Sequence, residues 1–127
     1  MSTVLIVEDN EKNLRLARDV LEFGGFTALE ATTAEDGLVV AAEQRPDVIL
    51  MDIQLPGMDG VAALAELRAN PVTASIPVVA LTAFAMSGDR DRLVNAGFDD
   101  YVAKPIDIDR LLDTVTRLSG VAGGATP

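Results

Sequence analysis

The chain has 127 residues, of which 49% are hydrophobic, and this is enough for one folded domain with a single core. It contains neither cysteine nor histidine, which excludes disulfides, thiolate or imidazole metal sites and chemistry on a histidine of this chain. A bound metal would need oxygen ligands, which favours Mg²⁺ or Ca²⁺. The net charge of −10 makes the chain a poor match for the phosphate backbone of nucleic acids.

Short apolar runs alternate with longer helical patterns along the chain. Strands are predicted near residues 3–7, 27–31, 48–51, 77–81 and 100–103. Helices are predicted near residues 11–23, 35–44, 59–69, 85–95 and 108–118. The first, third and fourth strands are continuously apolar, which is typical of strands covered by helices on both faces. Five such units predict an α/β fold, a flavodoxin-like (βα)5 doubly wound parallel sheet with strand order 2-1-3-4-5.

Residues that favour helix ends support these boundaries. Asn10 and Asp107 are predicted to cap the first and last helices, and Gly24-Gly25 to end the first. Asp59 is interpreted as a turn and helix-cap residue rather than a catalytic one. The helical spacing of Leu16, Ala17, Val20, Leu21 and Gly24 predicts the buried face of the first helix, with Leu14 at its edge.

The chain reads as one domain over residues 1–119, followed by a flexible tail over residues 120–127 that is rich in glycine and alanine. Apolar runs stay shorter than a membrane span, and Met1-Ser2-Thr3 leads directly into a strand without a signal-peptide pattern. We therefore expect a monomeric cytoplasmic protein that binds neither membranes nor nucleic acid.

Polar residues follow four of the predicted strands at their carboxyl ends. Glu8 and Asp9 follow the first strand, Asp52 the third, Thr82 the fourth and Lys104 the fifth. Because ligands bind beyond the carboxyl ends of strands in such sheets, we expect these side chains to meet. Three carboxylates about 5 Å apart would repel by roughly 3 kcal/mol per pair at an effective dielectric near 20. A divalent cation would relieve this repulsion and neutralise a phosphoryl group, which Asp52 could accept as an acyl phosphate.

Each of these residues also has an ordinary structural interpretation. Asp52 could cap a turn, and Glu8 and Asp9 could be solvated loop acids. Thr82 is β-branched and suits a strand end in any case, whereas most lysines, like Lys104, are simply solvated. Their convergence at one edge of the sheet is what favours a binding site. The sequence leaves open whether the peptide bond before Pro105 is cis.

The motifs at these strand ends resemble the receiver domain of two-component response regulators over about residues 3–118. The resemblance rests on Val7-Glu8-Asp9-Asn10, Met51-Asp52, Leu55-Pro56-Gly57-Met58-Asp59-Gly60, Leu81-Thr82-Ala83 and Lys104-Pro105. Three stretches, residues 5–10, 50–56 and 79–86, are most similar to the single-domain DivK type, which acts in cell-division and polarity control. The resemblance implies that Asp52 is the phosphoacceptor and that Glu8 and Asp9 bind Mg²⁺ together with the main-chain carbonyl of Gln54. Glu8 stands where many members have Asp.

The resemblance also implies roles for the remaining strand ends and for partners. Thr82 and Lys104 would bind the phosphoryl group, and the rotamer of Tyr101 would follow Thr82. The phosphodonor would be a histidine on a separate kinase or phosphotransfer protein. Apart from the resemblance, we predict that Leu14 is a docking contact for this donor, because it lies at the edge of the buried stripe in the turn nearest Asp52; the alternative is a peripheral core leucine. We predict output through the face made by the fourth helix, fifth strand and fifth helix; the alternative is a static Tyr101 with output on the first helix. Phe84 is predicted to screen the acyl phosphate from water and so slow its loss.

Three other classes compete with a signalling switch that catalyses only its own phosphorylation and dephosphorylation. A Mg²⁺-dependent phosphohydrolase with an aspartyl nucleophile would resemble an Asp-x-Asp motif, but Gln54 holds the second position here. A flavin-binding carrier would need a glycine-rich phosphate loop where Glu8-Asp9-Asn10-Glu11 would repel phosphate. The chain could also be a receiver fragment of a larger hybrid kinase or multidomain regulator.

Overall fold

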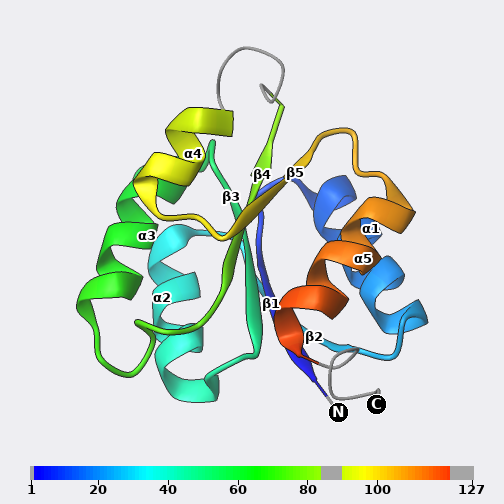
Figure 1. Cartoon of the computed structure of the whole chain (residues 1–127), viewed down its shortest axis with the longest axis horizontal. Helices are drawn as coiled ribbons and strands as arrows, with labels where there is room; N and C mark the ends of the chain where they lie inside the picture. The colour runs from blue at the N-terminus through cyan, green and yellow to red at the C-terminus, as the bar shows by residue number, and fades with distance from the viewer. Residues whose placement is uncertain (1, 84–89, 121–127) are drawn as a thin grey trace.

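The computed structural model describes residues 2–83 and 90–120 and contains a five-stranded parallel sheet in the order β2-β1-β3-β4-β5 (Figure 1). The strands are β1 (Thr3–Val7), β2 (Thr27–Ala31), β3 (Val48–Asp52), β4 (Val78–Thr82) and β5 (Asp100–Ala103). The helices are α1 (Glu11–Phe23), α2 (Ala34–Gln44), α3 (Gly60–Ala69), α4 (Arg90–Ala96) and α5 (Ile108–Ser119). The predicted fold class and strand order are confirmed.

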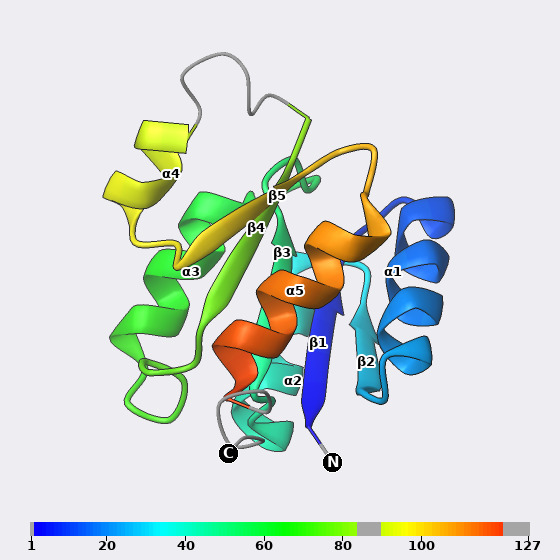
Figure 2. The same cartoon turned by 45° about the vertical axis from the view of Figure 1, so that its right-hand side comes forward.

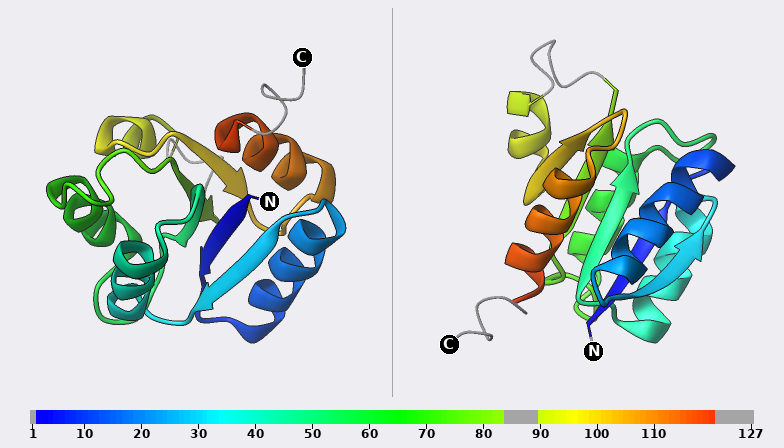
Figure 3. Two further views of the ribbon diagram at one scale, coloured as in Figure 1. Left: turned by 90° about the horizontal axis from the view of Figure 1, so that it is seen from below. Right: turned by 90° about the vertical axis from the view of Figure 1, so that its right-hand side faces the viewer.

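Helices cover the sheet on both faces, as the continuously apolar strands predict. Figures 1 and 3 show α1 and α5 on one face and α2, α3 and α4 on the other. Successive strand side chains point to opposite faces, so β1 contributes to two cores. Val4 and Ile6 pack in the α1 and α5 layer, whereas Leu5 and Val7 pack in the layer of α2, α3 and α4.

The helix caps follow local side-chain chemistry. The side chains of Asn10, Asp59 and Asp107 accept hydrogen bonds from main-chain N–H groups three residues later, as the sequence predicts. Thr33 caps α2 in the same way, which the sequence reading missed. Helix α1 ends at Gly24, and Gly25 follows in a left-handed conformation with φ of 91° that favours glycine.

The boundaries differ from the predictions in small ways. The third strand continues through Asp52 and the fourth through Thr82, so both polar residues belong to the strands themselves. Residues 85–89 of the predicted fourth helix and Phe84 lie outside the described residues, and the shielding role of Phe84 stays a prediction. Of the described helices, none is both long and apolar enough to span a membrane.

The predicted buried face of α1 is wrong at two positions, because Leu16 and Gly24 are exposed. Leu16 is 37% exposed, whereas Leu14 is only 9% exposed and packs in the core with Ala17 and Leu21. The spacing of Leu14, Ala17 and Leu21 by three and four residues fits a helix face, and Leu16 lies well off that stripe. Leu14 is thus part of the buried face rather than its edge.

Candidate functional site

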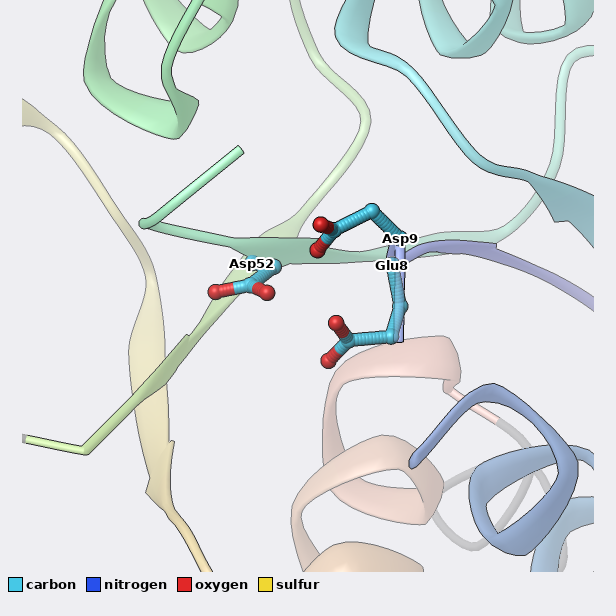
Figure 4. Close-up of side chains that lie close together, drawn as sticks. All are labelled: Glu8, Asp9 and Asp52. Atoms are coloured by element: carbon cyan, nitrogen blue, oxygen red, sulfur yellow. The ribbon is translucent and has the colours of Figure 1, made fainter. Parts of the chain in front are cut away.

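Three carboxylates meet at the carboxyl ends of the two central strands. Strands β1 and β3 are paired neighbours, which places Glu8 and Asp9 beside Asp52. One carboxylate oxygen from each of the three residues lies within 4.8 Å of the others, and Figure 4 shows the side chains pointing toward one another. Glu8 and Asp52 are buried and Asp9 is exposed. The cluster therefore has a buried floor and one side open to solvent.

The main chain around Asp52 is held by its neighbours on two sides. The N–H of Ile53 donates to the carbonyl of Leu81 at 3.1 Å, and the N–H of Gly60 donates to the carbonyl of Ile53, also at 3.1 Å. A Cβ atom on Gly60 would lie only 2.4 Å from the carbonyl oxygen of Asp52. Glycine is therefore required where α3 begins, because any side chain would displace the Asp52 main chain.

Both oxygens of the Asp52 carboxylate have a donor. Oδ1 accepts from the N–H of Gln54 at 3.0 Å, and Oδ2 accepts from Nζ of Lys104 at 2.9 Å. Gln54 is thus placed beside the cluster through its main chain, while its side chain is exposed. The predicted role of its carbonyl as a metal ligand stays a prediction. These two hydrogen bonds hold the Asp52 carboxylate in one orientation at the end of the buried strand β3.

Lys104 contacts both buried carboxylates. Its Nζ lies 3.0 Å from Oε1 of Glu8 in addition to its hydrogen bond with Asp52, and its N–H donates to the carbonyl of Thr82 at 2.8 Å. Burial opposes its positive charge, but the bonds with Asp52 and Glu8 outweigh this and raise the pKa of Lys104 above its ordinary value. The peptide bond between Lys104 and Pro105 is cis, which answers the question that the sequence leaves open.

Glu8 is a fully buried carboxyl with opposing influences on its charge. Burial first and the neighbouring Asp52 next raise the pKa of Glu8 to about 7 from an ordinary value of 4.5. The N–H of Asn10, which donates to Oε2 at 3.1 Å, and the ammonium of Lys104 act in the opposite direction. The sequence reading predicted the carboxylate cluster but missed how strongly burial would bias Glu8 toward its protonated form.

Thr82 and Tyr101 lie on neighbouring strands at this side of the molecule. Thr82 is 1% exposed and pairs in register with Ala103, while Tyr101 pairs with Ala80 and is half-buried. The side chain of Arg110 in α5 lies over the ring of Tyr101, with 5.5 Å between the guanidinium carbon and the ring centroid. The sequence reading missed Arg110, because nine residues and a change of element separate the two side chains.

The charges at this edge are not balanced. Among the described residues, three carboxyl groups converge there on one ammonium, so the site has an excess of two negative charges when Glu8 is ionised and of one when it is protonated. The atoms that these three residues offer to a metal ion are carboxylate oxygens, the ligands that Mg²⁺ prefers. Leu14, the predicted docking residue, lies in the first turns of α1 next to this edge but is mostly buried.

The comparisons with known proteins agree with this geometry. The family model described as response regulator receiver domain matches residues 4–116. The polar-differentiation response regulator DivK of Brucella anthropi is 42% identical over 120 residues, which cover 94% of this chain and 98% of that protein.

Two solved structures share the fold along almost the whole chain. One is the receiver domain of the sensor histidine kinase PA1611 from Pseudomonas aeruginosa, with a magnesium ion coordinated in its active-site cleft; it is 36% identical with a TM-score of 0.86 over 94% of this chain and 98% of that one. The other is a Francisella response regulator receiver domain, 27% identical with a TM-score of 0.87 over 95% and 98% of the two chains. The chain belongs to the family of response regulator receiver domains.

Proposed function

We propose that this protein is a signalling switch of the DivK type that is phosphorylated on Asp52. The observation that carries this proposal is the position of Asp52. Asp52 is 3% exposed, and its carboxylate is oriented by Gln54 and Lys104 and faces two further carboxylates. A buried acid with so little freedom and an unbalanced charge around it suits a nucleophile for phosphoryl transfer better than a turn cap.

Glu8, Asp9 and Asp52, together with the main-chain carbonyl of Gln54, are the proposed holders of Mg²⁺. The donor set fits this ion, since it consists of oxygens with an excess of negative charge. When bound, the ion would neutralise the cluster and the oxygens of an incoming phosphoryl group. The magnesium in the similar PA1611 receiver supports this assignment.

The residues of the chain itself supply the rest of the proposed chemistry. A carboxylate oxygen of Asp52 forms a bond to phosphorus as the bond from phosphorus to a histidine nitrogen of the donor breaks, and the electron pair leaves with that nitrogen. Lys104 is already 2.9 Å from Asp52 and would pair with the transferred oxygens. Thr82, buried at the end of β4, would donate its hydroxyl to another of them.

The proposed partners are a histidine kinase or phosphotransfer protein and a downstream protein. Leu14 stays a predicted docking contact, but its 9% exposure offers little area, so we propose that the neighbouring Leu16, at 37%, carries more of the contact. Output is proposed on the face of α4, β5 and α5, with Tyr101 turning as Thr82 moves. The match to proteins named polar-differentiation response regulator DivK supports a role in cell polarity. A role in cell division and a cytoplasmic location are part of the same proposal.

The test is phosphorylation of the full chain by acetyl phosphate with Mg²⁺, followed by intact mass. The native chain should gain one phosphoryl group, and Asp52→Asn should gain none. Asp59→Asn is the matched control, because Asp59 lies seven residues away and caps α3 without joining the cluster. Labelling of Asp52→Asn equal to that of the native chain would refute the proposal.

The phosphohydrolase alternative predicts a different result. Such an enzyme would use a second acid two residues after its nucleophile, and the residue there is Gln54. Release of phosphate from a small phosphate ester in many turnovers would favour that class, whereas a single stable phosphoryl group on Asp52 favours the switch.

A further inference from the structure

The start of β5 carries a second charged cluster, built around the carboxylate of Asp100. Its Oδ1 accepts from the N–H of Tyr101 at 2.7 Å and from Nη2 of Arg110 at 3.2 Å. Its Oδ2 pairs with the guanidinium of Arg117. Two arginines of α5 are thus fixed to the strand that carries the proposed switch aromatic, and both are about half exposed, at 44% and 53%.

Of these two arginines, Arg110 contacts Tyr101. Nη2 of Arg110 donates to the main-chain carbonyl of Tyr101 at 2.8 Å, and its guanidinium lies 5.5 Å from the ring centroid. The ring is therefore held by a cation–π contact while the main chain beneath it is held by a charged hydrogen bond. Arg117 shares the carboxylate of Asp100 but makes neither of these contacts.

The contact joins two layers of the molecule. Tyr101 packs against the core under α2, α3 and α4, whereas Leu111, next to Arg110, packs in the core under α1 and α5. Because β5 is an edge strand, Arg110 can reach around it from α5 to the ring, and Figure 2 shows α5 running beside β5 at this edge. A rotation of the ring toward β4 would separate it from the guanidinium.

We propose that Arg110 is a positioning residue that holds Tyr101 in the orientation seen here and so opposes the repacking that follows phosphorylation. The packing seen here goes with an Asp52 carboxylate paired directly with Lys104, the arrangement expected before phosphoryl transfer. The inference rests on the proposed function, in which Tyr101 follows Thr82. It adds that the equilibrium between the two packings is set from α5, on the opposite face of the sheet.

Tyrosine emission gives a direct probe, because Tyr101 is the only tyrosine and the chain has no tryptophan. The experiment uses the full chain with Mg²⁺ and beryllofluoride, a phosphoryl mimic. Two quantities are measured: the binding of beryllofluoride by fluorine NMR, and the quenching of Tyr101 emission by acrylamide. The variants are Arg110→Gln and Arg110→Lys, with Arg117→Gln as the matched control. The cap of α5 is preserved in each, because Asp107 bonds the main-chain N–H of Arg110 rather than its side chain.

Removing the contact between Arg110 and Tyr101, called the Arg110 clamp below, should favour the rotated position of the Tyr101 ring. By linkage, it should also tighten the binding of beryllofluoride. We expect Arg110→Gln to bind beryllofluoride about tenfold more tightly than the native chain, which corresponds to about 1.4 kcal/mol. Arg110→Lys should lie between them, and Arg117→Gln should stay within about twofold of native. Without the mimic, acrylamide quenching in Arg110→Gln should already move toward the value that the native chain reaches with it.

Three results would overturn the inference, and they separate it from the proposed function. Equal affinities in Arg110→Gln and Arg117→Gln, with a normal response of Tyr101 in the native chain, would remove the clamp and leave the switch intact. Binding of the mimic without any change in Tyr101 quenching in the native chain would remove the switch role of Tyr101 and the clamp with it. A native chain that does not bind the mimic would overturn the proposed function at Asp52 itself.

Discussion

The parallel sheet carries charged groups of opposite character at the amino ends and at the carboxyl ends of its strands. At the amino ends, the Arg68 guanidinium donates to the carbonyls of Ala74, Ile76 and Gly97 over 2.7 to 3.2 Å and to Asp99 at 2.9 Å. Asp99 also accepts from the N–H of Val78, so one cation and one anion satisfy each other and the surrounding main chain. At the carboxyl ends, three carboxylates share a single ammonium.

This difference separates stabilising charges from binding charges. The Arg68 group is neutral and satisfied, and it ties the loop before β4 to the loop before β5. The carboxylate cluster, in which Glu8 and Asp52 are buried, carries more negative charge than Lys104 compensates, and this lowers stability until a cation binds. Similar side chains thus serve different purposes, and the balance of charge rather than the number of charged residues distinguishes them.

The largest expected effect on stability comes from removing Arg68, whose charge is balanced by Asp99. Arg68→Ala should lower the free energy of unfolding by about 3 kcal/mol, because it leaves Asp99 and several carbonyls without their charged donor. Urea unfolding measures this, and the gain in stability on adding Mg²⁺ should stay the same as in the native chain. Arg15→Ala is the control, since within residues 2–83 and 90–120 Arg15 forms only an exposed pair with Glu11. Equal stabilities for the two variants would refute the structural role of Arg68.

The cluster of Glu8, Asp9 and Asp52 should instead make the stability of the chain depend on a bound cation. Adding Mg²⁺ at 100 times its dissociation constant should stabilise the native chain by about 2.7 kcal/mol. Asp9→Asn should lose most of this gain, and it should be more stable than the native chain without metal because one repulsive charge is gone. Thermal unfolding across a Mg²⁺ titration checks both effects, with Asp59→Asn as a control that leaves the cluster intact. A flat titration of the native chain would contradict the metal site.

The pH dependence of stability should show the same imbalance through Glu8. Its folded pKa of about 7 lies above the ordinary 4.5, so between these values the folded chain retains a proton that the unfolded chain releases. Stability should therefore fall as pH rises through this window, by roughly 1 kcal/mol per pH unit, and level off above it. Mg²⁺ binding should weaken as pH falls below 7 within the same window.

Glu8→Gln isolates this contribution. The variant keeps the shape of the side chain but cannot ionise, so the slope of stability against pH between 4.5 and 7 should be shallower than in the native chain. Urea unfolding at several pH values in that window measures both slopes, and parallel curves for the two chains would rule out Glu8 as the titrating group. The paired Lys104 and Asp52 remain in both chains and serve as an internal reference.

The sequence predicts the sheet and the cluster well for a physical reason. In a parallel sheet, topology alone brings the carboxyl ends of β1 and β3 together, so Glu8, Asp9 and Asp52 could be placed without any side-chain detail. Contacts made by long side chains are different. The reach of Lys104 to Glu8 and of Arg110 around β5 to Tyr101 depends on rotamers and helix tilt, which residue spacing does not encode.

Helix α1 shows a second limit of residue spacing. An apolar residue on an amphipathic helix can belong to the core or to an exposed apolar surface, and hydrophobicity is the same for both. Leu14 and Leu16 differ by two positions, which turns their side chains about 200° apart around the helix axis. Only the packing of α1 on the sheet shows that Leu14 faces the core and Leu16 faces solvent.

The smallest expected effect tests whether the docking surface for the histidine donor extends from the carboxylate cluster to the exposed side of α1 around Leu16. Leu16 lies with Val20, Phe23 and Ile108 around an apolar hollow between α1 and α5, and Phe23 is 85% exposed. If a histidine donor docks there, Leu16→Ala should slow phosphotransfer about threefold, since a single edge contact usually contributes less than about 1 kcal/mol. Labelling by acetyl phosphate should be unchanged, because that small donor needs no docking surface.

Leu14→Ala is the matched comparison. If Leu14 is the docking contact, this variant should slow transfer from the histidine donor. It should also lower the free energy of unfolding by about 2 kcal/mol through the cavity it leaves. Comparing both donors and both stabilities separates the two leucines. Transfer from the histidine donor that is slowed by Leu14→Ala alone, at temperatures where both variants are fully folded, would place the docking contact on Leu14 and confine the docking surface to the immediate rim of the carboxylate cluster.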